Sequence, residues 1–391
     1  MTEEKKRILV MTSVHPWDDP RIFYKEALSL SKKYQVEVHA PADFQLKEEQ
    51  GIRIIGLPKY RRGFRFLNWM RLFFRALNSP ARYVHFHDPE LIPVGIMLRF
   101  LAGKKVIYDV HEDFPASIMT KSWIPEYMKK SLARLANFLE LRAARLFHGI
   151  ILAEFSYAER FRPLGVYMET VANYPPRSLG RETFAERMPE GKDTRDGEAG
   201  ERGPVGFVYA GVISKPRGII EMIKSFALAE KQGLDFRLFL IGPWVTPELR
   251  KETEEMIRNL GLEERVTITG KIPFPELMKI YRQCDVGLAL LHPEKNYLTS
   301  FATKIFEYMA VGIPVLASNF PLWKVLVLGL RCGVTVNPLD IEAISKKIAL
   351  LVKRRSWRHR LGMNGWAAFN SYFNWETQEE KLWEFYKKLD G

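Results

Sequence analysis

The 391-residue sequence has little of what marks disulfide-rich secreted proteins, zinc sites or membrane-spanning proteins. Its two cysteines, Cys284 and Cys332, are far apart and have no C-x-x-C or histidine companions, so neither a disulfide framework nor a zinc site is expected. No stretch approaches the roughly 20 apolar residues of a membrane-spanning helix. The apolar run at residues 8–14 lacks the small-residue cleavage site of a signal peptide and predicts a buried strand. These absences favour the reducing cytoplasm.

Acidic residues are also fewer than basic residues. The chain has 46 aspartates and glutamates against 59 lysines and arginines, which gives a formal net charge of +13. Hydrophobic residues make up 47% and charged residues 27%, as in an ordinary globular protein. The excess of positive charge therefore favours polyanionic partners, with nucleic acid, an anionic membrane surface and phosphorylated substrates as the alternatives.

The order of elements predicts two α/β domains. Short β-branched runs alternate with helical patterns, and most are continuously apolar, which is typical of parallel strands buried on both faces. In the first half we expect strands at residues 7–12, 35–40, 52–57, 83–87, 105–109 and 149–153. In the second half we expect them at residues 206–210, 236–241, 266–269, 286–290, 314–317 and 333–336. This predicts two doubly wound Rossmann-like domains.

A polar segment separates the two sets of strands. Residues 176–204 are rich in glycine, proline and charge and poor in apolar residues, which predicts a linker. The expected domains are therefore residues 1–175 and 205–366, followed by a terminal helix at 367–391. Because ligands of open α/β sheets bind at the carboxyl ends of the strands, we expect a site in a cleft between the two domains.

The segment most informative about chemistry is residues 303–318. Glu307 is a carboxylate among packing residues on an expected short helix, where it could accept hydrogen bonds from paired hydroxyls such as those of a ribose. The start of that helix, near residues 300–304, offers free N–H groups to phosphate or sugar oxygens. The alternative interpretation of Glu307 is a surface residue that stabilises the helix.

This segment resembles the donor-binding motif of the GT-B fold, retaining glycosyltransferases of family four, also called glycosyl transferases group 1. Residues 209–218 resemble the family's phosphate loop, and residues 241–243 and 269–272 resemble the turns flanking the nucleotide base. Residues 364–365 and 373–389 resemble the terminal helix that crosses back to the first domain. Residues 15–26 and 108–115 are similar to a branch that builds bacterial surface polysaccharides. The resemblance covers nearly the whole chain.

The resemblance implies a set of site residues. It gives catalytic roles to His111, Arg217, Lys304 and Glu307, and it places substrate-binding residues at His15, Asp19, Arg21, Glu112, Asp113, Gly211, Ile272, Thr299, Ser300, Phe301, Ala302 and Thr303. The donor is expected to be a UDP- or GDP-sugar, with no cofactor and no metal.

Two positions depart from the family pattern. The family commonly has a glutamate eight residues before Glu307, where this chain has Thr299, and an arginine after the first glycine of the phosphate loop, where it has Val212. Arg217 keeps one loop cation, and Lys304 or Lys215 is expected to supply the second.

The first-domain candidates have structural alternatives. His111 follows an expected strand and matches the family histidine near the donor sugar, with Glu112 and Asp113 beside it, yet the acids could equally cap a helix. For the loop of His15, Asp19 and Arg21 the alternative is a helix cap with a salt bridge. His85, His87 and Asp88 suggest metal ligation, which we do not expect, because His87 and Asp88 resemble another strand end facing the cleft.

A basic amphipathic segment occupies residues 59–77, which hold six cations and no acid. This pattern is typical of a helix on an anionic membrane surface, with contacts expected from Arg61, Arg65, Trp69, Arg71, Phe73 and Arg75. The basic stretch at 121–145 could extend the surface. The alternative is a surface helix packed on the sheet with solvated arginines, and no recognised nucleic-acid module appears.

Together these features predict a glycosyltransferase on the inner face of the cell membrane. It is expected to transfer a sugar, with retention, from a nucleotide-sugar to a saccharide acceptor, itself lipid-linked, in surface-polysaccharide biosynthesis. The alternatives are a nucleotide-sugar epimerase on the same fold and a non-catalytic protein that binds membranes or nucleic acid.

Overall fold

The computed structural model describes residues 6–119, 121, 123–180 and 203–390, and it divides the chain into two compact units. Unit 1 comprises Met1–Asn173 together with Trp375–Gly391, and unit 2 comprises Tyr174–Asn374. Most of the expected linker lies outside the described residues. The chain returns to unit 1 at Trp375 rather than at residue 367, because a helix of unit 2, α15 (Arg355–Ser371), continues past that point.

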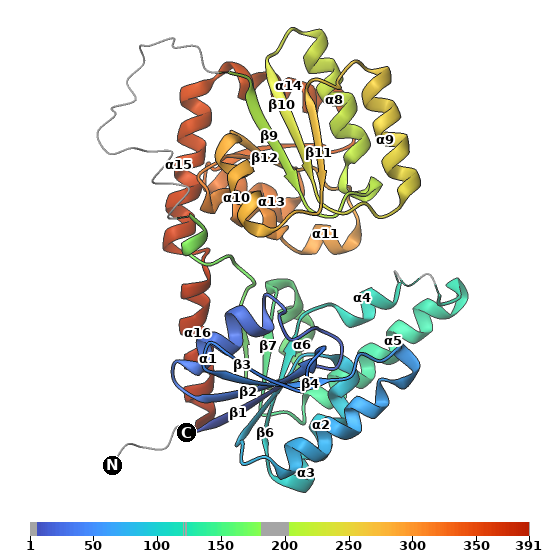
Figure 1. Cartoon of the computed structure of the whole chain (residues 1–391), viewed down its shortest axis with the longest axis vertical. Coiled ribbons are helices and arrows are strands. Elements are labelled where there is room, and N and C mark those ends of the chain that lie inside the picture. The colour runs from blue at the N-terminus through green and yellow to red at the C-terminus, as the bar shows by residue number, and fades with distance from the viewer. Residues whose placement is uncertain (1–5, 120, 122, 181–202, 391) are drawn as a thin grey trace. The chain divides into compact units, whose positions relative to one another are not determined.

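Unit 1 is built on a sheet of eight strands in the order β3-β4-β2-β1-β5-β6-β7-β8 (Figure 1). All neighbouring strands are parallel except β3, which pairs antiparallel with β4. The strands are β1 (Arg7–Met11), β2 (Gln35–Pro41), β3 (Leu46–Glu49), β4 (Ile52–Leu57), β5 (Tyr83–Phe86), β6 (Lys105–Val110), β7 (Gly149–Leu152) and β8 (Met168–Thr170).

Helices cover both faces of this sheet, which explains the continuous apolar runs. In β1, Leu9 and Met11 join the core under α2, α3 and α5, whereas Ile8 and Val10 join the core under α1 and α16. The helices are α1 (Leu28–Ser31), which continues a π-helical turn at Ile22–Ala27, α2 (Phe66–Asn78), α3 (Ile92–Ala102), α4 (Phe114–Met119), α5 (Glu126–Ala144), α6 (Ala158–Phe161) and α16 (Trp375–Asp390).

Unit 2 has a parallel sheet of six strands in the order β11-β10-β9-β12-β13-β14 (Figure 1). In sequence terms the order is 3-2-1-4-5-6, which is that of the Rossmann fold. The direction of winding reverses between β9 and β12, so the loops after these two strands diverge and leave room for a ligand. The strands are β9 (Val205–Ala210), β10 (Phe236–Ile241), β11 (Val266–Gly270), β12 (Val286–Ala289), β13 (Val315–Ser318) and β14 (Gly333–Val336).

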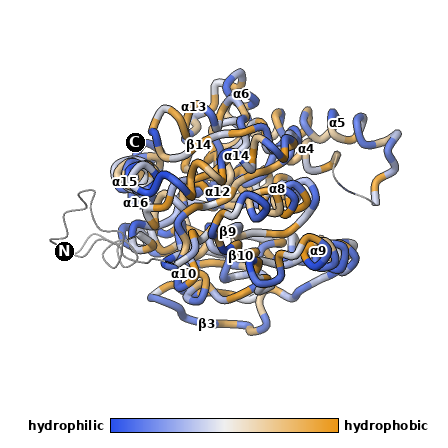
Figure 2. The backbone as a smooth tube through the Cα atoms, turned by 90° about the horizontal axis from the view of Figure 1, so that it is seen from above, coloured by the Kyte–Doolittle hydropathy of each residue, from blue (hydrophilic) through white to orange (hydrophobic). Residues whose placement is uncertain are grey.

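The helices of unit 2 hold this sheet in an apolar core. Residues of α8, α9 and α14 pack together against β9 and β10. Figure 2 shows α9 as largely hydrophilic along its course, as expected of a helix with one buried stripe. The helices are α8 (Ile219–Lys231), α9 (Pro247–Asn259), α10 (Phe274–Gln283), α11 (Lys295–Thr299), α12 (Thr303–Ala310), α13 (Pro321–Gly329), α14 (Ile341–Lys353) and α15.

All twelve predicted strands are present within a residue or so of the expected bounds, and the predicted fold class is confirmed. Two short strands, β3 and β8, were not expected. The sequence of β3 (LKEE) is polar and the strand lies at the sheet edge, where one side of the backbone pairs with β4 and the side chains stay half-exposed. β8 has only three residues. Neither strand carries the buried apolar run that made the others visible.

Candidate functional site

A pocket opens in unit 2 at the carboxyl ends of β9 and β12, where the winding of the sheet reverses. Its volume is about 270 Å³. Six of the predicted residues line it together, namely Arg217, Ser300, Phe301, Ala302, Thr303 and Lys304. The other lining residues are mostly apolar or aromatic and comprise Tyr209, Ala210, Leu288, Ala289, Leu291, Tyr297 and Trp323. A mostly apolar wall with two cations is typical of a site for an anionic ligand that has a flat or apolar part.

The phosphate loop runs from the end of β9 to Gly218. Gly218 has a φ of +76° and, if it had a Cβ, that atom would lie 1.9 Å from the carbonyl oxygen of Leu290, so no other residue fits this turn. The turn places the half-buried Arg217 in the pocket wall, with its guanidinium 6.0 Å from the centre of the Tyr297 ring. Burial opposes the charge of Arg217, but the phenols of Tyr209 and Tyr297 raise its pKa above the usual value.

The second cation in the pocket is Lys304, not Lys215. Lys215 is exposed and forms an ion pair with Glu252 at 2.9 Å, which agrees with the alternative of a solvated loop residue. Lys304 lies on the first turn of α12, whose N-terminus has no side-chain cap. Uncapped N–H groups and the positive end of the helix dipole add to the charge of Lys304, so this end of the pocket favours a phosphate.

Glu307 lies one turn further along α12, behind the pocket wall. Its Oε2 accepts hydrogen bonds from Lys304 Nζ at 2.6 Å and from the Tyr281 hydroxyl at 3.1 Å. Burial, followed by the charge of Glu307, raises the pKa of Tyr281 well above its usual value, so the phenol stays a donor. Within the described chain no side chain or backbone group bonds to Oε1. Tyr281 was not predicted, because nothing in the sequence of α10 relates it to α12.

The packing of Tyr308 fixes α12 against the sheet. Its ring lies so close to β12 that a Cβ on Gly287 would be 2.2 Å from it. Its hydroxyl donates to the carbonyl oxygens of Val208, at 3.2 Å, or Leu288, at 3.3 Å. The helix that carries Lys304 and Glu307 is therefore held at the ends of the two strands that flank the pocket.

Besides Glu307, three predicted residues of unit 2 lie outside the pocket lining. Thr299 is exposed at the end of α11, and its hydroxyl donates to the carbonyl oxygen of Lys295. Ile272 is half-buried in the turn before α10. Gly211 borders the pocket through Arg217, because a Cβ there would lie 3.3 Å from Arg217 Nη1. The roles of these residues stay predictions.

In unit 1, the predicted residues of the first loop gather at the carboxyl ends of β1 and β5. His15 forms ion pairs with Asp19 at 3.6 Å and Asp88 at 3.5 Å. Burial opposes the charged forms, but these contacts raise the pKa of His15 and lower that of Asp19 to about 2. The His15 ring lies 5.6 Å from that of His111, so two predicted residues meet although 96 positions separate them in sequence. Asp88 also accepts hydrogen bonds from Thr12 and Ser13, which makes it a structural anchor.

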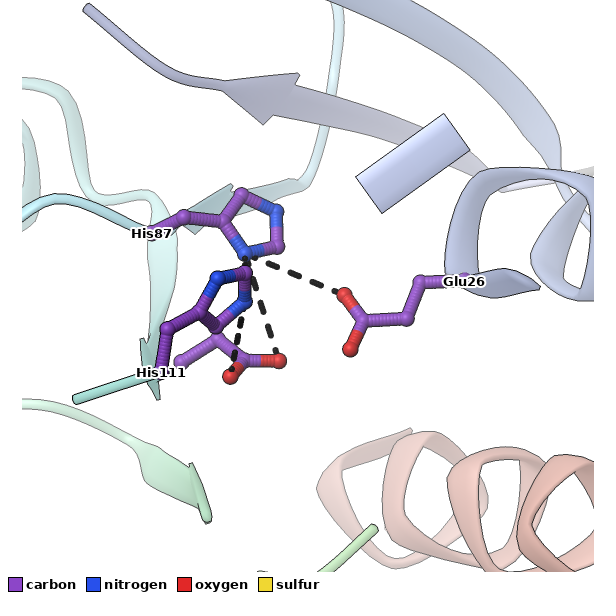
Figure 3. Close-up of side chains that lie close together, drawn as sticks. Glu26, His87 and His111 are labelled. Atoms are coloured by element: carbon purple, nitrogen blue, oxygen red, sulfur yellow. Dashed lines mark hydrogen bonds and ion pairs between the residues drawn. The ribbon is translucent and has the colours of Figure 1, made fainter. Parts of the chain in front are cut away.

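Beneath this loop lies a buried polar cluster, centred on Arg21. Figure 3 shows Glu26, His87 and His111 pointing toward one another, each from a different segment of unit 1. One atom each of Glu26, His87, Asp109 and His111 lies within 4.8 Å of the others, close enough to surround a cation. The guanidinium of Arg21, however, already contacts Asp109 at 3.1 Å and Glu26 at 2.8 Å. Arg21 thus supplies the positive charge of this cluster.

The pKa values of the two acids of the cluster are shifted in opposite directions. Burial raises the pKa of Glu26 well above its usual value, whereas the charge of Arg21 overcomes burial and lowers the pKa of Asp109. Burial also lowers the pKa of His85 and His87, which are therefore neutral. The sequence analysis considered His85 and His87 as metal ligands, and His87 also as part of a strand end. It included Glu26 only as the last residue of the segment 15–26 and gave it no role of its own.

The two acids after β6 have different surroundings, and a role in substrate binding stays a prediction for both. Asp113 accepts a hydrogen bond from the backbone N–H of Ala116, at 3.0 Å, and from Arg160. It therefore caps α4, as the structural alternative predicted. Glu112 is exposed beside His15 and contributes to the raised pKa of that residue.

The residues that helix α2 buries are not those that the sequence suggested. Asn68, Leu72 and Ala76 form the buried stripe, and Trp69 and Phe73 pack partly against the same core. Trp69 Nε1 also donates to Glu90. Trp69 and Phe73 were both expected to contact a membrane, but they pack partly against the core of unit 1 instead. The exposed apolar side chains of α2 are instead Phe66, Met70, Phe74 and Leu77.

Two Rossmann-like units, each with polar groups at the switch point of its sheet, define the GT-B class of folds. Solved structures with this fold are similar to the chain over nearly its whole length. The chain has a TM-score of 0.71 to sucrose-phosphate synthase of Thermosynechococcus elongatus, with 18% identity, covering 98% of this chain and 99% of that one. It has a TM-score of 0.70 to Anabaena Alr3699/HepE in complex with UDP-glucose, with 16% identity and the same coverage. The predicted GT-B fold is confirmed.

The sequence comparisons show which family within this fold class the chain resembles. Residues 193–367 match the family model described as glycosyl transferases group 1, which confirms the predicted resemblance. Over 187 residues the chain is 27% identical to the capsular polysaccharide biosynthesis glycosyltransferase CapM of Staphylococcus aureus. That alignment spans 47% of each protein, so the chain matches about half the length of this curated relative. Among the described residues, no helix is both long and apolar enough to cross a membrane.

Proposed function

We propose that the protein is a glycosyltransferase that takes a sugar from a UDP- or GDP-sugar bound in the pocket of unit 2. The observation that carries the proposal is the pairing of Arg217 and Lys304 in one pocket wall with the uncapped N-terminus of α12. The group 1 match over the same segment and the UDP-glucose bound to a structural relative support a nucleotide-sugar donor. Similarity to CapM supports a saccharide acceptor in surface-polysaccharide biosynthesis, which we propose to be lipid-linked.

The proposed chemistry relies on electrostatics. The bond between the anomeric carbon and the phosphate oxygen breaks, and a bond to the acceptor oxygen forms on the same face of the sugar, so that the configuration is retained. The departing phosphate oxygen takes the acceptor's proton, and no protein nucleophile is needed. Negative charge grows on the diphosphate, where Arg217, Lys304 and the helix N–H groups stabilise it. Glu307 Oε1 accepts hydrogen bonds from the ribose hydroxyls.

The phosphate loop offers a matched pair of variants as a test. Arg217→Ala should lower kcat/KM about 100-fold, the scale for losing one charged transition-state contact. Lys215→Ala removes a cation two residues away that is exposed and paired with Glu252, and it should leave the rate nearly unchanged. Nucleoside diphosphate release is measured over a panel of UDP-, GDP- and ADP-sugars. If no donor binds or turns over, the proposal is wrong and a non-catalytic binding protein becomes the better account.

We further propose that unit 1 lies on the inner face of the cell membrane through helices α2, α3 and α5. Exposed apolar side chains gather on these helices and on the turn before α5, including Phe74, Phe100, Trp123, Phe138 and Leu139. Figure 2 shows hydrophobic and hydrophilic segments alternating along α5. Arg62 lies 4.5 Å from the centre of the Trp123 ring, which links the two basic stretches of the sequence. Arginines beside exposed aromatic rings suit an interface with anionic lipid.

Vesicle flotation tests this surface. The protein should float with vesicles of phosphatidylcholine and phosphatidylglycerol, and less with phosphatidylcholine alone. Phe74→Ser should weaken flotation severalfold, because the side chain is 57% exposed on α2. Val325→Ser, at a 76% exposed apolar residue of unit 2, is the matched control and should float as the wild type does. Equal flotation of both variants would contradict the proposal.

A further inference from the structure

Three side chains of unit 1 converge on one nitrogen of His111. Its Nε2 lies 2.9 Å from His87 Nδ1, 3.2 Å from Arg21 Nε and 3.2 Å from Asp109 Oδ1. The other ring nitrogen, Nδ1, bonds to no group in the described part of the chain, and the side chain keeps 11% of its surface exposed. His111 thus turns one nitrogen into the buried cluster and leaves the other free.

Arg21 determines whether Nε2 of His111 donates or accepts a hydrogen bond. A guanidinium only donates, and its Nε carries a single hydrogen. That hydrogen is directed at His111, although Glu26 Oε1 lies only 2.8 Å from the same nitrogen. Arg21 cannot rotate away, because its Nη2 donates to Asp109 and its Nη1 donates to the carbonyl oxygen of Val171 at 2.8 Å. Nε2 therefore accepts a hydrogen bond and carries no proton.

The neighbouring histidines agree with this assignment. His87 Nδ1 is nearer to His111 Nε2 than to Glu26 Oε2, at 3.8 Å, or Asp109 Oδ2, at 4.0 Å, so it donates to His111. The buried ring nitrogen of His87 that has no hydrogen-bond partner, Nε2, is then an acceptor. Leaving a buried acceptor unpaired costs less free energy than leaving a buried N–H group unpaired. His85 accepts from the Tyr386 hydroxyl at Nδ1 and directs its Nε2 toward Asp109, at 3.5 Å.

We propose that Arg21 and His87 are positioning residues that hold Nε2 of His111 as a hydrogen-bond acceptor, with the ring proton on Nδ1. The free nitrogen is then a hydrogen-bond donor, suited to a hydroxyl oxygen of a ligand of unit 1 and not to the acceptance of a proton. This deepens the proposed glycosyltransferase function and depends on it for the identity of the ligand. The tautomer itself depends only on the contacts inside unit 1.

Nitrogen-15 NMR of the histidine rings tests the proposal on the full-length protein without substrate. The chain has eight histidines, so single variants can assign the signals. We expect His111 to show a protonated Nδ1 and an unprotonated Nε2. A proton on Nε2 in the wild type would overturn the proposal, whatever the enzyme does.

A pair of variants at residue 87 gives the causal test. His87→Asn keeps an amide N–H close to the position of Nδ1 and should keep both the tautomer and the activity. His87→Leu removes one of the two donors to Nε2 and leaves only Arg21, so a larger share of the protein should carry the proton on Nε2, where Asp109 can accept it. We then expect kcat/KM to fall about tenfold, the factor for one hydrogen bond, with UDP or GDP binding unchanged. An unchanged tautomer in folded His87→Leu would refute the role of His87.

Two readouts, the tautomer of His111 and the turnover of a nucleotide-sugar, separate this proposal from the transferase function. His39→Asn, at a buried histidine of β2 outside the cluster, is the matched control and should alter neither the His111 spectrum nor the rate. If no nucleotide-sugar is turned over but His111 has the expected tautomer, the function is wrong and the positioning stands. If turnover occurs with the proton on Nε2, the function stands and the positioning is wrong.

Discussion

At the scale of single residues, the charges of the pocket depend on contacts that sequence spacing hides. Lys304 and Glu307 are three positions apart on α12, but Tyr281 from α10 completes the group. Because Tyr281 and Lys304 both bond to Oε2, the carboxylate is held in one orientation with Oε1 free. We propose on this basis that Glu307 is an oriented ligand for hydroxyls, and the alternative of a surface residue that stabilises a helix stays open to the test below.

Replacing this carboxylate tests that interpretation. Glu307→Gln keeps the size of the side chain but removes its charge, and we expect kcat/KM to fall by a factor equivalent to at least about 2 kcal/mol. Glu254→Gln, which removes an exposed carboxylate paired with Arg250 on α9, should have little effect. Steady-state kinetics over the accepted donor make the comparison, and equal rates for the two variants would contradict the role.

The His15–Asp19 pair predicts a pH dependence of stability. The folded pKa of His15 is raised above 6.5, so its contribution is complete below that pH and is lost as the pH rises through the folded value. The pKa of Asp19 falls from 3.8 to about 2, so its contribution is present above 3.8 and is lost as the pH falls toward 2. His15→Asn should therefore lower the free energy of unfolding most near about pH 5 and less near about pH 9.

Urea unfolding at these two pH values measures the difference. His39→Asn should show the opposite trend, because burial lowers the pKa of His39 and its contribution therefore grows as the pH rises. A loss from His15→Asn that is the same at both pH values would show that the pair is not charged in the folded protein.

At the scale of elements, helix α12 and strand β12 pack in close contact. The Tyr308 ring of α12 occupies the place where Gly287 of β12 would have a side chain. Gly287→Ala should therefore push α12 away from the strand and lower the free energy of unfolding by about 1–3 kcal/mol, as overpacking does. The movement should also weaken nucleotide binding, because α12 carries Lys304.

Denaturant unfolding and isothermal titration with UDP and GDP test both effects. Gly329→Ala is the matched control, since nothing lies within 4 Å of its added methyl group and the residue lies in α13. It should be neutral or slightly stabilising, because alanine is the better helix former. A destabilised Gly287→Ala protein that binds nucleotide normally would separate the packing of α12 from the pocket.

At the scale of the whole molecule, the C-terminal helix α16 is part of the core of unit 1. Trp375, Leu382, Phe385 and Tyr386 are buried in the same core as β1 and β2. Phe385 packs on β7, where a Cβ on Gly149 would lie 2.5 Å from its ring. Unit 1 is therefore complete only when the last residues of the described chain are in place.

Phe385→Ala tests this dependence. It should lower the free energy of unfolding of unit 1 by about 3–5 kcal/mol, as the loss of a buried aromatic side chain does, whereas unit 2 should unfold as before. Lys387→Ala, at an exposed position of the same helix, should change little. Differential scanning calorimetry follows the transitions. A change in the transition of unit 2 alone would show that α16 does not stabilise unit 1.

By itself, the sequence determined the fold class, the twelve principal strands and six of the residues that line the pocket of unit 2. Strands buried on both faces have continuous apolar runs, and nine of the thirteen residues of the pocket wall lie in two short segments, 209–218 and 297–304, where local spacing carries the information. Only the tertiary structure decided which cation joins Arg217, which side of α2 is buried and which groups surround His111. The physical reason is that these depend on packing between elements distant in sequence. The partner of Lys215 lies on α9, Trp69 bonds to Glu90, and His111 meets Arg21 across 90 positions.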